Sequence, residues 1–271
     1  MKTGIIGMLA VICCFAACSP GSKKDTSNVG VALYSFNRFS LAEGLQKANQ
    51  AGVTYVEGFS FHQLGGEFGE QSLGTLNESA LANVRSLLQE NDLQMVSMYA
   101  DGKTLTEWQA LFETGKQLGL EFLVGEPEPQ LWDGLDSLAS NYGIKLAIHQ
   151  HAKGQSRFWH PDSVLAALEG HPHFAACGDL GHWARSGLDP VECLKQLEGH
   201  LMSIHAKDLD SFGNLDAADV KAGTGIINYN AVFAELRRQK FNGFIFVECE
   251  HDWDNNFDDV KAAVDLLTAA E

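Results

Sequence analysis

The feature that most constrains the fold is a regular alternation of short apolar runs with amphipathic stretches, from residue 29 to the end of the chain. Eight runs have the length of buried strands: VGVALYSF (29–36), TYVEGF (54–59), LQMVSMYA (93–100), EFLVGE (121–126), IKLAIHQH (144–151), FAACGDL (174–180), LMSIHAK (201–207) and GFIFVECE (243–250). Strands that alternate with helices form a parallel sheet with the helices outside. Eight such units favour a single α/β domain, a closed (β/α)8 TIM barrel over residues 29–271, rather than an open doubly wound sheet.

The stretches between these runs carry the signals of helices. Ser40, Asn77, Asp189 and Asn228 stand where helix N-caps are expected, and several of the stretches stop at glycine. A glycine-rich phosphate loop would support the open sheet, but GTLNES lacks that pattern and LGGEFG lacks the GxGxxG spacing. The sequence therefore predicts the closed barrel.

Residues 1–17 have the features of a bacterial lipoprotein signal peptide, with an early Lys2 and an apolar run that leads to Ala16, Ala17 and Cys18. The apolar run is shorter than the roughly 20 residues of a transmembrane helix. We expect Cys18 to be lipidated and residues 18–28 to form a flexible tether. The protein would then be an extracytoplasmic lipoprotein, periplasmic or in the cell envelope, with the anchor as its only membrane contact. The alternative is ordinary secretion with cleavage nearby.

The formal charge of −16 limits the partners of the chain. Nucleic-acid sites neutralise phosphates with Lys and Arg, so we expect no nucleic-acid partner, and a strongly phosphorylated substrate is disfavoured. A small neutral carbohydrate and a bound cation suit this balance better. Cys177, Cys193 and Cys249 are too scattered for a disulfide framework, and we interpret them as small buried apolar residues. The oligomeric state stays open.

Carboxylates and histidines gather at the C-terminal ends of the expected strands, where the side chains of a barrel converge on one mouth. They are Glu57, Glu126, His149, His151, Asp179, His205, Lys207, Glu248 and Glu250. Because side chains alternate along a strand, His149 and His151 are expected on one face. Imidazole and carboxylate ligands together suit one divalent ion, Mn, Co, Zn, Fe or Mg. The alternative for each residue taken alone is a solvated or hydrogen-bonded side chain at a strand end.

Four segments, GIKLAIHQH, CGDLGHWARSGLDP, SIHAKDL and GFIFVECEHD, resemble in order and spacing the xylose-isomerase-like TIM barrels, often called sugar phosphate isomerases/epimerases. That superfamily includes inosose dehydratases, ketose 3-epimerases and metal endonucleases. The resemblance implies Asp179, His205 and Glu248 as metal ligands. The family's glutamate on the fifth strand is absent. His149 stands in its place and is expected to be the fourth ligand, while His151 takes the place of a histidine that is frequent in the family.

The resemblance also implies removal of a proton next to a carbonyl, with a metal-stabilised enediolate. In the epimerases two metal-bound glutamates exchange protons on opposite faces of the sugar, and one of them is an imidazole here. Glu248 is then a ligand or the base. The other candidates for a catalytic acid or base are Lys207, His151 and Glu126.

Several further residues are expected near the substrate. They are Glu57, His182, Trp183, Arg185 and Trp159. His182 has an alternative as an extra ligand or an outer hydrogen-bond partner of one, and Arg185 has a structural alternative. The two tryptophans would stack on a sugar ring or pack in a lid. Lys207 has an alternative as a salt-bridge partner of Asp208 or Glu250.

Three functions remain open at this point. The first is a metal-dependent isomerase or epimerase of a sugar or keto-sugar. The second is a lyase or hydratase that acts on 3-keto-glycosides or keto-sugars derived from them. The third is a non-catalytic sugar-binding lipoprotein. The endonuclease activity is set aside, because the chain is acidic and its ligand set is too small for three zinc ions.

Overall fold

The computed structural model describes Met1, residues 28–69 and residues 71–271, and within these it confirms the closed barrel. Residues 2–17 of the predicted signal peptide and residues 18–27 of the predicted tether, with Cys18, lie outside the described residues. Eight parallel strands close the ring in the order β1-β10-β7-β6-β5-β4-β3-β2. Their bounds are Val29–Ala32 (β1), Tyr55–Phe59 (β2), Gln94–Tyr99 (β3), Phe122–Gly125 (β4), Lys145–Ile148 (β5), Phe174–Asp179 (β6), Leu201–Ala206 (β7) and Phe244–Val247 (β10).

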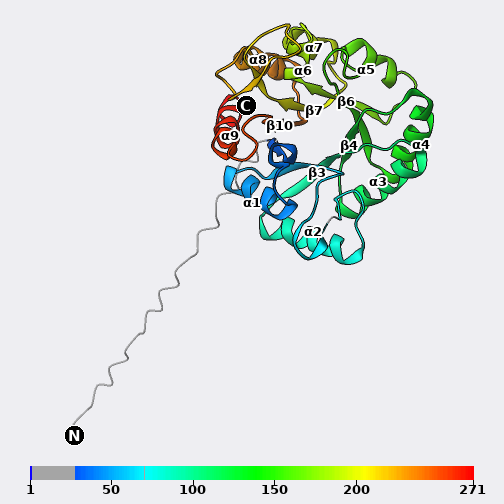
Figure 1. The fold of residues 1–271 in the computed structure, drawn as a ribbon, viewed down its shortest axis with the longest axis vertical. Helices are drawn as coiled ribbons and strands as arrows, with labels where there is room; N and C mark the ends of the chain where they lie inside the picture. Colours follow the sequence, from blue (N-terminus) through cyan, green and yellow to red (C-terminus); the bar gives the residue numbers. More distant parts are fainter. Residues whose placement is uncertain (2–27, 70) are drawn as a thin grey trace.

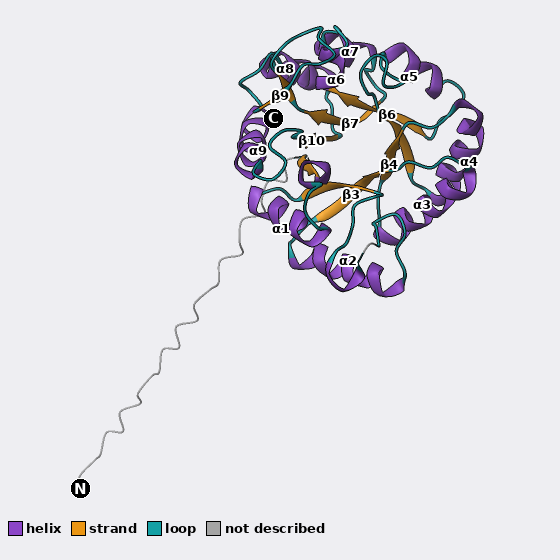
Figure 2. Cartoon of the chain, in the orientation of Figure 1, coloured by secondary structure: helices purple, strands orange, loops and turns teal. Residues whose placement is uncertain are grey.

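Helices surround the ring of strands, as Figure 1 and Figure 2 show from the same side. The helices are α1 (Leu41–Ala51), α2 (Glu78–Glu90), α3 (Leu105–Leu118), α4 (Trp132–Tyr142), α5 (Pro161–Leu168), α6 (Leu180–Arg185), α7 (Pro190–Gln196), α8 (Tyr229–Gln239) and α9 (Phe257–Ala270). Among the residues that the structure describes, no helix combines the length and the apolar character that a membrane-spanning helix needs.

The expected N-caps are confirmed. The side chains of Asn77, Asp189 and Asn228 accept backbone N–H groups of the first turns of α2, α7 and α8. Ser40 forms a capping box at α1, in which its hydroxyl accepts the Glu43 N–H and the Glu43 carboxylate accepts the Ser40 N–H. Sequence signals alone therefore locate these four helix starts.

Three strands end three or four residues before their expected C-terminal ends. The first expected strand stops at Ala32, and Leu33–Phe36 forms a 3-10 helix, η1, because β10 pairs only with Val29–Val31. The expected strands 144–151 and 243–250 stop at Ile148 and Val247. His149 and Glu248 are thus the first residues past their strands, and their N–H groups continue the ladder by donating to Gly125 and Ala206.

Two apolar layers fix the barrel. The interior is filled near its N-terminal end by stacked rings, with Phe122 and Phe246 on either side of Phe244 at centroid distances of 6.1 and 5.9 Å. A second, larger layer lies between the strands and the helices. Cys177, Cys193 and Cys249 are free and buried, as their interpretation as apolar residues predicts.

The connection from β7 to α8 carries an extra element. Two short strands, β8 (Asp208–Leu209) and β9 (Asp219–Val220), pair antiparallel outside the barrel. The segment between them passes over the C-terminal mouth, where Leu215, Asp216 and Ala217 line the cavity described next. The closed barrel and this segment of the β7–α8 connection together enclose a polar site at the C-terminal ends of the strands.

Candidate active site

A cavity of about 570 Å³ opens at the C-terminal ends of the strands. Most of the predicted site residues line it, namely Glu57, His149, His151, His182, Arg185, His205 and Glu248. Its volume lies within the range of small-molecule sites. The barrel therefore brings together residues that are up to 191 positions apart in the sequence, from Glu57 to Glu248.

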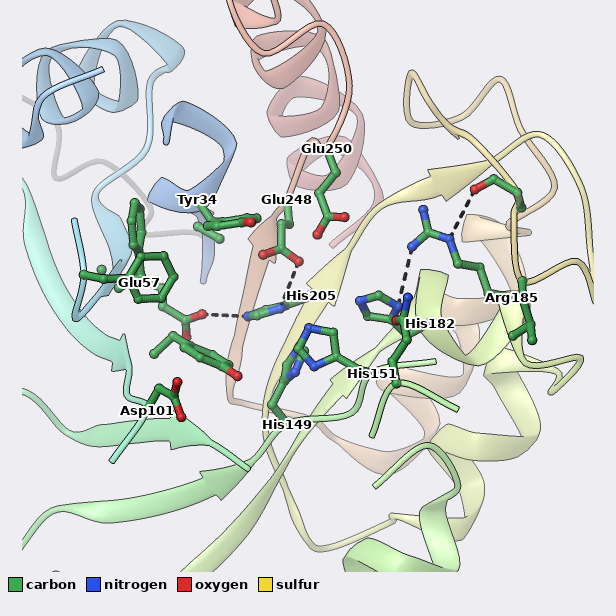
Figure 3. A pocket seen from close by; sticks show the side chains of 18 of the residues that line it. Tyr34, Glu57, Asp101, His149, His151, His182, Arg185, His205, Glu248 and Glu250 are labelled. Atoms are coloured by element: carbon green, nitrogen blue, oxygen red, sulfur yellow. Dashed lines mark hydrogen bonds and ion pairs between the residues drawn. The ribbon is translucent and has the colours of Figure 1, made fainter. Parts of the chain in front are cut away.

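His205 is held in one orientation by Glu57. The Nε2 atom of His205 lies 2.7 Å from Oε1 of Glu57, and the Ser97 hydroxyl donates to the other oxygen of that carboxylate at 2.7 Å. Nδ1 of His205 then faces Oε2 of Glu248 at 3.1 Å and Oδ2 of Asp179 at 3.7 Å. Figure 3 shows Glu57 and Glu248 on opposite sides of this imidazole.

His149 is held in the same way by a different carboxylate. Its Nδ1 atom lies 3.0 Å from Oε1 of Glu126, and its Nε2 atom faces Oδ2 of Asp179 at 3.6 Å. His151 Nδ1 contacts the same Glu126 oxygen. Carboxylates that orient the far nitrogen of an imidazole are the usual outer partners of metal-bound histidines. Glu57 and Glu126 thus orient the histidines. The substrate contact predicted for Glu57, which lines the cavity, and the catalytic role predicted for Glu126 stay predictions.

The donor atoms fit a divalent metal ion. Nε2 of His149 and Nδ1 of His205 are buried and form no hydrogen bond with any described residue. The separations of 3.1, 3.6 and 3.7 Å to Glu248 and Asp179 are close to the distance between two ligand atoms on one ion, about 3 to 3.5 Å. The ligand atoms of Asp179, His205 and Glu248 all lie within 4.8 Å of one another. A metal ion would satisfy these two imidazole nitrogens, which face carboxylates but form no hydrogen bond with any described residue.

Lys207 adds a positive charge to this cluster. Its ammonium lies 2.7 Å from Glu248, 2.7 Å from Glu250 and 3.2 Å from Asp179, and the side chain is buried. The salt bridge with Glu250 is one of the two alternatives that the sequence leaves open. Asp208 instead accepts four backbone N–H groups, of Leu209, Gly223, Gly225 and Ile227.

Burial and charge shift the pKa values of the cluster. Burial disfavours the ionised carboxyl of Asp179, but the Lys207 ammonium and the neighbouring histidines His182, His149 and His205 together outweigh it and hold the pKa of Asp179 well below its usual range. The same opposition, with Lys207 and His205 as the favourable neighbours, lowers the pKa of Glu248. Burial also lowers the pKa of His149, but the interactions with Asp179 and Glu126 raise it to about 10. The carboxylates are therefore ready to bind a cation, while a metal has to displace a proton from the imidazole.

His182 and Arg185 lie on the other side of the cavity, on the short helix α6. Asp179 caps this helix by accepting the His182 N–H at 2.8 Å, and Nε2 of His182 lies 3.9 Å from its carboxylate. Arg185 pairs with Asp219 of β9 at 2.9 Å and donates to the Ala217 carbonyl. Arg185 thus ties the segment over the mouth to the site, which matches its structural alternative, and it still lines the cavity.

The two tryptophans are placed differently from the expectation. Trp183 is fully buried and does not face the cavity, because its ring packs so closely on β6 that a Cβ at Gly178 would lie 2.5 Å from it. The described residues that line the cavity do not include Trp159 either, which carries the Lys153 ammonium 4.9 Å from its ring. The structure therefore offers neither ring to a ligand in the cavity.

Other aromatic and acidic residues, which sequence reasoning missed as site residues, do line the cavity. They are Tyr34, Phe59, Phe61, Tyr99 and Asp101. Tyr99 is the last residue of β3 and lies edge-on to His149 at a centroid distance of 5.7 Å. Its place at a strand end was the available signal. Tyr34 belongs to η1, which the sequence presents as part of a strand.

Comparisons with known proteins agree with this architecture. The profile of the family described as "Xylose isomerase-like TIM barrel" matches residues 45–270. An inosose dehydratase of Mesomycoplasma hyopneumoniae (strain 7448) is 30% identical over 148 residues, which are 48% of this chain and 49% of that enzyme. The chain thus matches about half the length of this curated relative.

Solved structures match over most of the chain. An uncharacterised protein from Parabacteroides distasonis ATCC 8503 is 30% identical, with a TM-score of 0.71 over 90% of this chain and 98% of that chain. A structure of the IOLI protein with a bound zinc atom has a TM-score of 0.74 at 19% identity, over 90% of this chain and 99% of that one. With a family profile that covers most of its length and a barrel of the same fold, the chain belongs to the xylose isomerase-like TIM barrel family.

Proposed function

We propose that this protein is a divalent-metal-dependent enzyme that removes a proton next to the carbonyl of a sugar or keto-sugar. The observation that carries this proposal is the grouping of Asp179, His205 and Glu248, whose ligand atoms all lie within 4.8 Å of one another. Nε2 of His149 lies 3.6 Å from Asp179, and this nitrogen and Nδ1 of His205 are buried without a hydrogen bond to any described residue. The zinc atom in the related IOLI structure is consistent with such a site. Names within the family, such as inosose dehydratase, support a carbohydrate-like substrate.

Each residue of the cluster has a separate proposed role. His149, Asp179, His205 and Glu248 would hold the ion, which can be Mn, Co, Zn, Fe or Mg. When bound, it would polarise a carbonyl and make the neighbouring C–H more acidic. Lys207 is buried between Glu248 and Glu250. Its ammonium would donate a hydrogen bond to the substrate oxygen on which negative charge develops. His151 lies half-buried in the cavity wall with Glu126 behind it, a suitable position for a base.

Elimination or hydration is the second candidate, and one observation favours it over epimerisation. Inversion by two opposed carboxylates needs a carboxylate on each side of the sugar, and the place opposite Glu248 holds the imidazole of His149. Loss or addition of water needs one base and one acid, which His151 and Lys207 would supply. The curated relatives are named inosose dehydratases, and the structure of a 3-keto-D-glucoside 4-epimerase from E. coli shares the fold. The substrate in this case would be a 3-keto-glycoside or a derived keto-sugar.

Metal analysis combined with isotope exchange tests the proposal. The purified protein should contain one divalent ion per chain, and both metal and activity should be lost in Asp179→Ala and His205→Ala. Asp216→Ala at the cavity rim is the matched control and should keep both. A metal-free protein that still binds sugar would contradict catalysis and support the sugar-binding alternative.

Incubation with 3-keto-glucosides and with free ketoses in heavy water separates the two reactions. Deuterium at the α-carbon with all oxygens retained indicates an isomerase or epimerase. Release of water or of an aglycone indicates a lyase or hydratase.

We also propose that the protein is anchored outside the cytoplasm through lipid on Cys18. The early Lys2, the apolar run and the Ala16-Ala17-Cys18 sequence support this. Labelled palmitate fed to the producing cells should enter the wild-type chain and not the Cys18→Ser variant. Secretion of a soluble, unlabelled wild-type protein would contradict the anchor.

A further inference from the structure

We propose that the substrate has two sugar rings and that a groove beside the cavity binds the ring that does not react. The inference rests on the proposed function, because it adds the size of the substrate to the same site. The groove has a volume of about 660 Å³ and is lined by residues of η1, of the segment after β2 and of the segment after β10. Tyr34, Phe59 and Phe61 line both the groove and the cavity, so the two spaces adjoin at these three side chains.

Aromatic rings form the junction between the two spaces. Tyr34 stands edge-on to Phe59, Phe61 and Trp253 at centroid distances of 5.5, 6.3 and 5.7 Å. Phe61 is 53% exposed at this junction, so its ring is accessible to a ligand that passes from the cavity to the groove. In Figure 3, Tyr34 lies on the side of Glu57 and Glu248, away from Arg185. A ligand that leaves the metal-binding cluster on this side therefore meets aromatic faces first.

The groove is preformed by hydrogen bonds between its walls. The Leu41 N–H donates to the Gln63 carbonyl at 3.0 Å, and Nε2 of His62 donates to the Phe39 carbonyl at 3.1 Å. On the third wall, the Asn256 amide donates to the Ser35 carbonyl at 2.7 Å. These bonds join three separate connections at the mouth. A site that is already ordered loses little entropy when a ligand binds.

The backbone next to Trp253 supports a built site. Asp252 has a φ of 43°, in the left-handed region that residues other than glycine rarely adopt. The turn is closed by the Asn255 N–H, which donates to the Asp252 carbonyl at 2.7 Å. This conformation sets Trp253 against Tyr34 at the groove. Strained backbone of this kind is retained where the surroundings need the side chain in one place.

The lining matches a second pyranose ring. Aromatic faces contact the C–H faces of a sugar ring, and Asn37, Arg38 and Gln63 supply polar groups around them for its hydroxyls. His62 adds no charge at neutral pH, because burial lowers its pKa to about 4. A keto-disaccharide would thus place its oxidised ring over His149, Asp179, His205 and Glu248, and its other ring beside Tyr34, Phe61 and Trp253.

The test compares substrates with one and two rings. The α-proton exchange of keto-glucose in heavy water is measured beside that of trehalose, maltose and cellobiose, each oxidised on one ring. For the wild type we expect kcat/KM to be about tenfold higher for at least one of the disaccharides. Trp253→Ala should reduce this ratio to near one. Phe212→Ala, whose ring is 55% exposed outside the groove, should keep the ratio. Equal rates for one and two rings in the wild type would overturn the inference.

If no substrate exchanges its α-proton, that result counts against the proposed function and not against the groove. A binding experiment then tests the groove. Titration calorimetry of the three unoxidised disaccharides and of glucose, with the metal-loaded wild type and Trp253→Ala, reports on the groove directly. At least one disaccharide should bind about tenfold more tightly than glucose, and Trp253→Ala should remove the difference. Disaccharides that bind no better than glucose would overturn the inference.

Discussion

Two histidines in the cavity, His149 and His205, are oriented by carboxylates that lie on the side away from Asp179. Glu57 fixes His205 through Nε2, and Glu126 fixes His149 through Nδ1, so that the remaining nitrogens face Asp179. The ring orientation, and with it the basicity of the free nitrogen, is set by these outer hydrogen bonds. Affinity for a metal should therefore be sensitive to residues that do not touch it.

The first prediction follows from this dependence. Glu57→Gln keeps the shape of the side chain but removes the charge that holds Nε2 of His205, so we expect metal affinity to fall about 10- to 100-fold. Competition with a fluorescent chelator measures it. Glu121→Gln, at an exposed position at the opposite end of the barrel, is the matched control. An affinity equal to the wild type in Glu57→Gln would contradict the dependence of metal binding on the charge of Glu57.

The second prediction concerns His62, which is 2% exposed and has its pKa lowered to about 4 by burial. The unfolded chain, with a histidine pKa of about 6.5, takes up the proton first. His62 therefore does not reduce the free energy of unfolding above about pH 6.5. It reduces this free energy increasingly as the pH falls from about 6.5 toward 4. Between pH 7 and pH 5 the loss is about 2 kcal/mol.

Urea unfolding at pH 7 and pH 5 checks the sign. The wild type should lose about 2 kcal/mol more than His62→Gln over this interval. His200→Gln, at an exposed position, should behave like the wild type. An identical pH dependence in the wild type and His62→Gln would refute the burial of a neutral imidazole.

At the scale of elements, the β7–α8 connection is organised around one carboxylate. Oδ1 of Asp208 accepts the Leu209 and Ile227 N–H groups at 2.9 Å each, and Oδ2 accepts those of Gly223 and Gly225 at 2.9 and 3.0 Å. The same connection carries the cavity-lining segment and Asp219, the partner of Arg185. Its shape therefore affects the mouth of the cavity.

The third prediction is that Asp208→Asn destabilises the protein by about 2 to 4 kcal/mol, because an amide NH2 group replaces one acceptor and faces two backbone N–H groups. The free energy of unfolding in urea measures the change. Catalytic activity should fall together with stability, since Asp219, the ion-pair partner of Arg185, lies on the same connection. Asp210→Asn, an exposed neighbour on the same connection, should cost less than 1 kcal/mol. Equal stabilities of the two variants would contradict this account.

Sequence patterns predict elements better than they predict the contacts between them. All eight barrel strands and four N-caps follow from local periodicity and capping, which depend on a few neighbouring residues. The meeting of His149, Asp179, His205 and Glu248 follows from the barrel, because strand ends converge. The roles of Glu57 and Glu126 cannot be predicted in this way. The hydrogen bond between Glu57 and His205, for example, joins residues 148 positions apart, and no local sequence pattern indicates it. The buried position of Trp183 is not visible in local sequence either, because α6 turns this ring inward against Gly178.

For the whole molecule, the acidic site should couple metal binding to global stability. With a formal charge of −16, and several carboxylates around the one buried ammonium of Lys207 beside the cavity, a divalent ion should favour the folded state. At 100 times the dissociation constant, binding adds about 2.7 kcal/mol. For a domain of this size that corresponds to roughly 5 to 10 °C in Tm.

The fourth prediction is that chelator-treated protein gains this Tm on titration with Zn²⁺, Mn²⁺, Co²⁺ or Mg²⁺ in a thermal-shift assay. His205→Ala should show no gain, whereas Asp101→Ala at the cavity wall should respond like the wild type. A similar shift in His205→Ala would mean that the ion binds to surface carboxylates.

The distribution of the cluster along the chain has a consequence for biosynthesis. Glu57 and Glu126 come from the first half of the sequence, and Glu248 lies 23 residues before its end. The ring closes only when β10, the last strand to be made, inserts between β1 and β7. A polypeptide that still lacks β10 also lacks Glu248, so the ion would be acquired only after β10 has been synthesised and inserted. The cell compartment where the last strand is inserted, rather than the one where the chain is translated, would then decide which metal the protein carries.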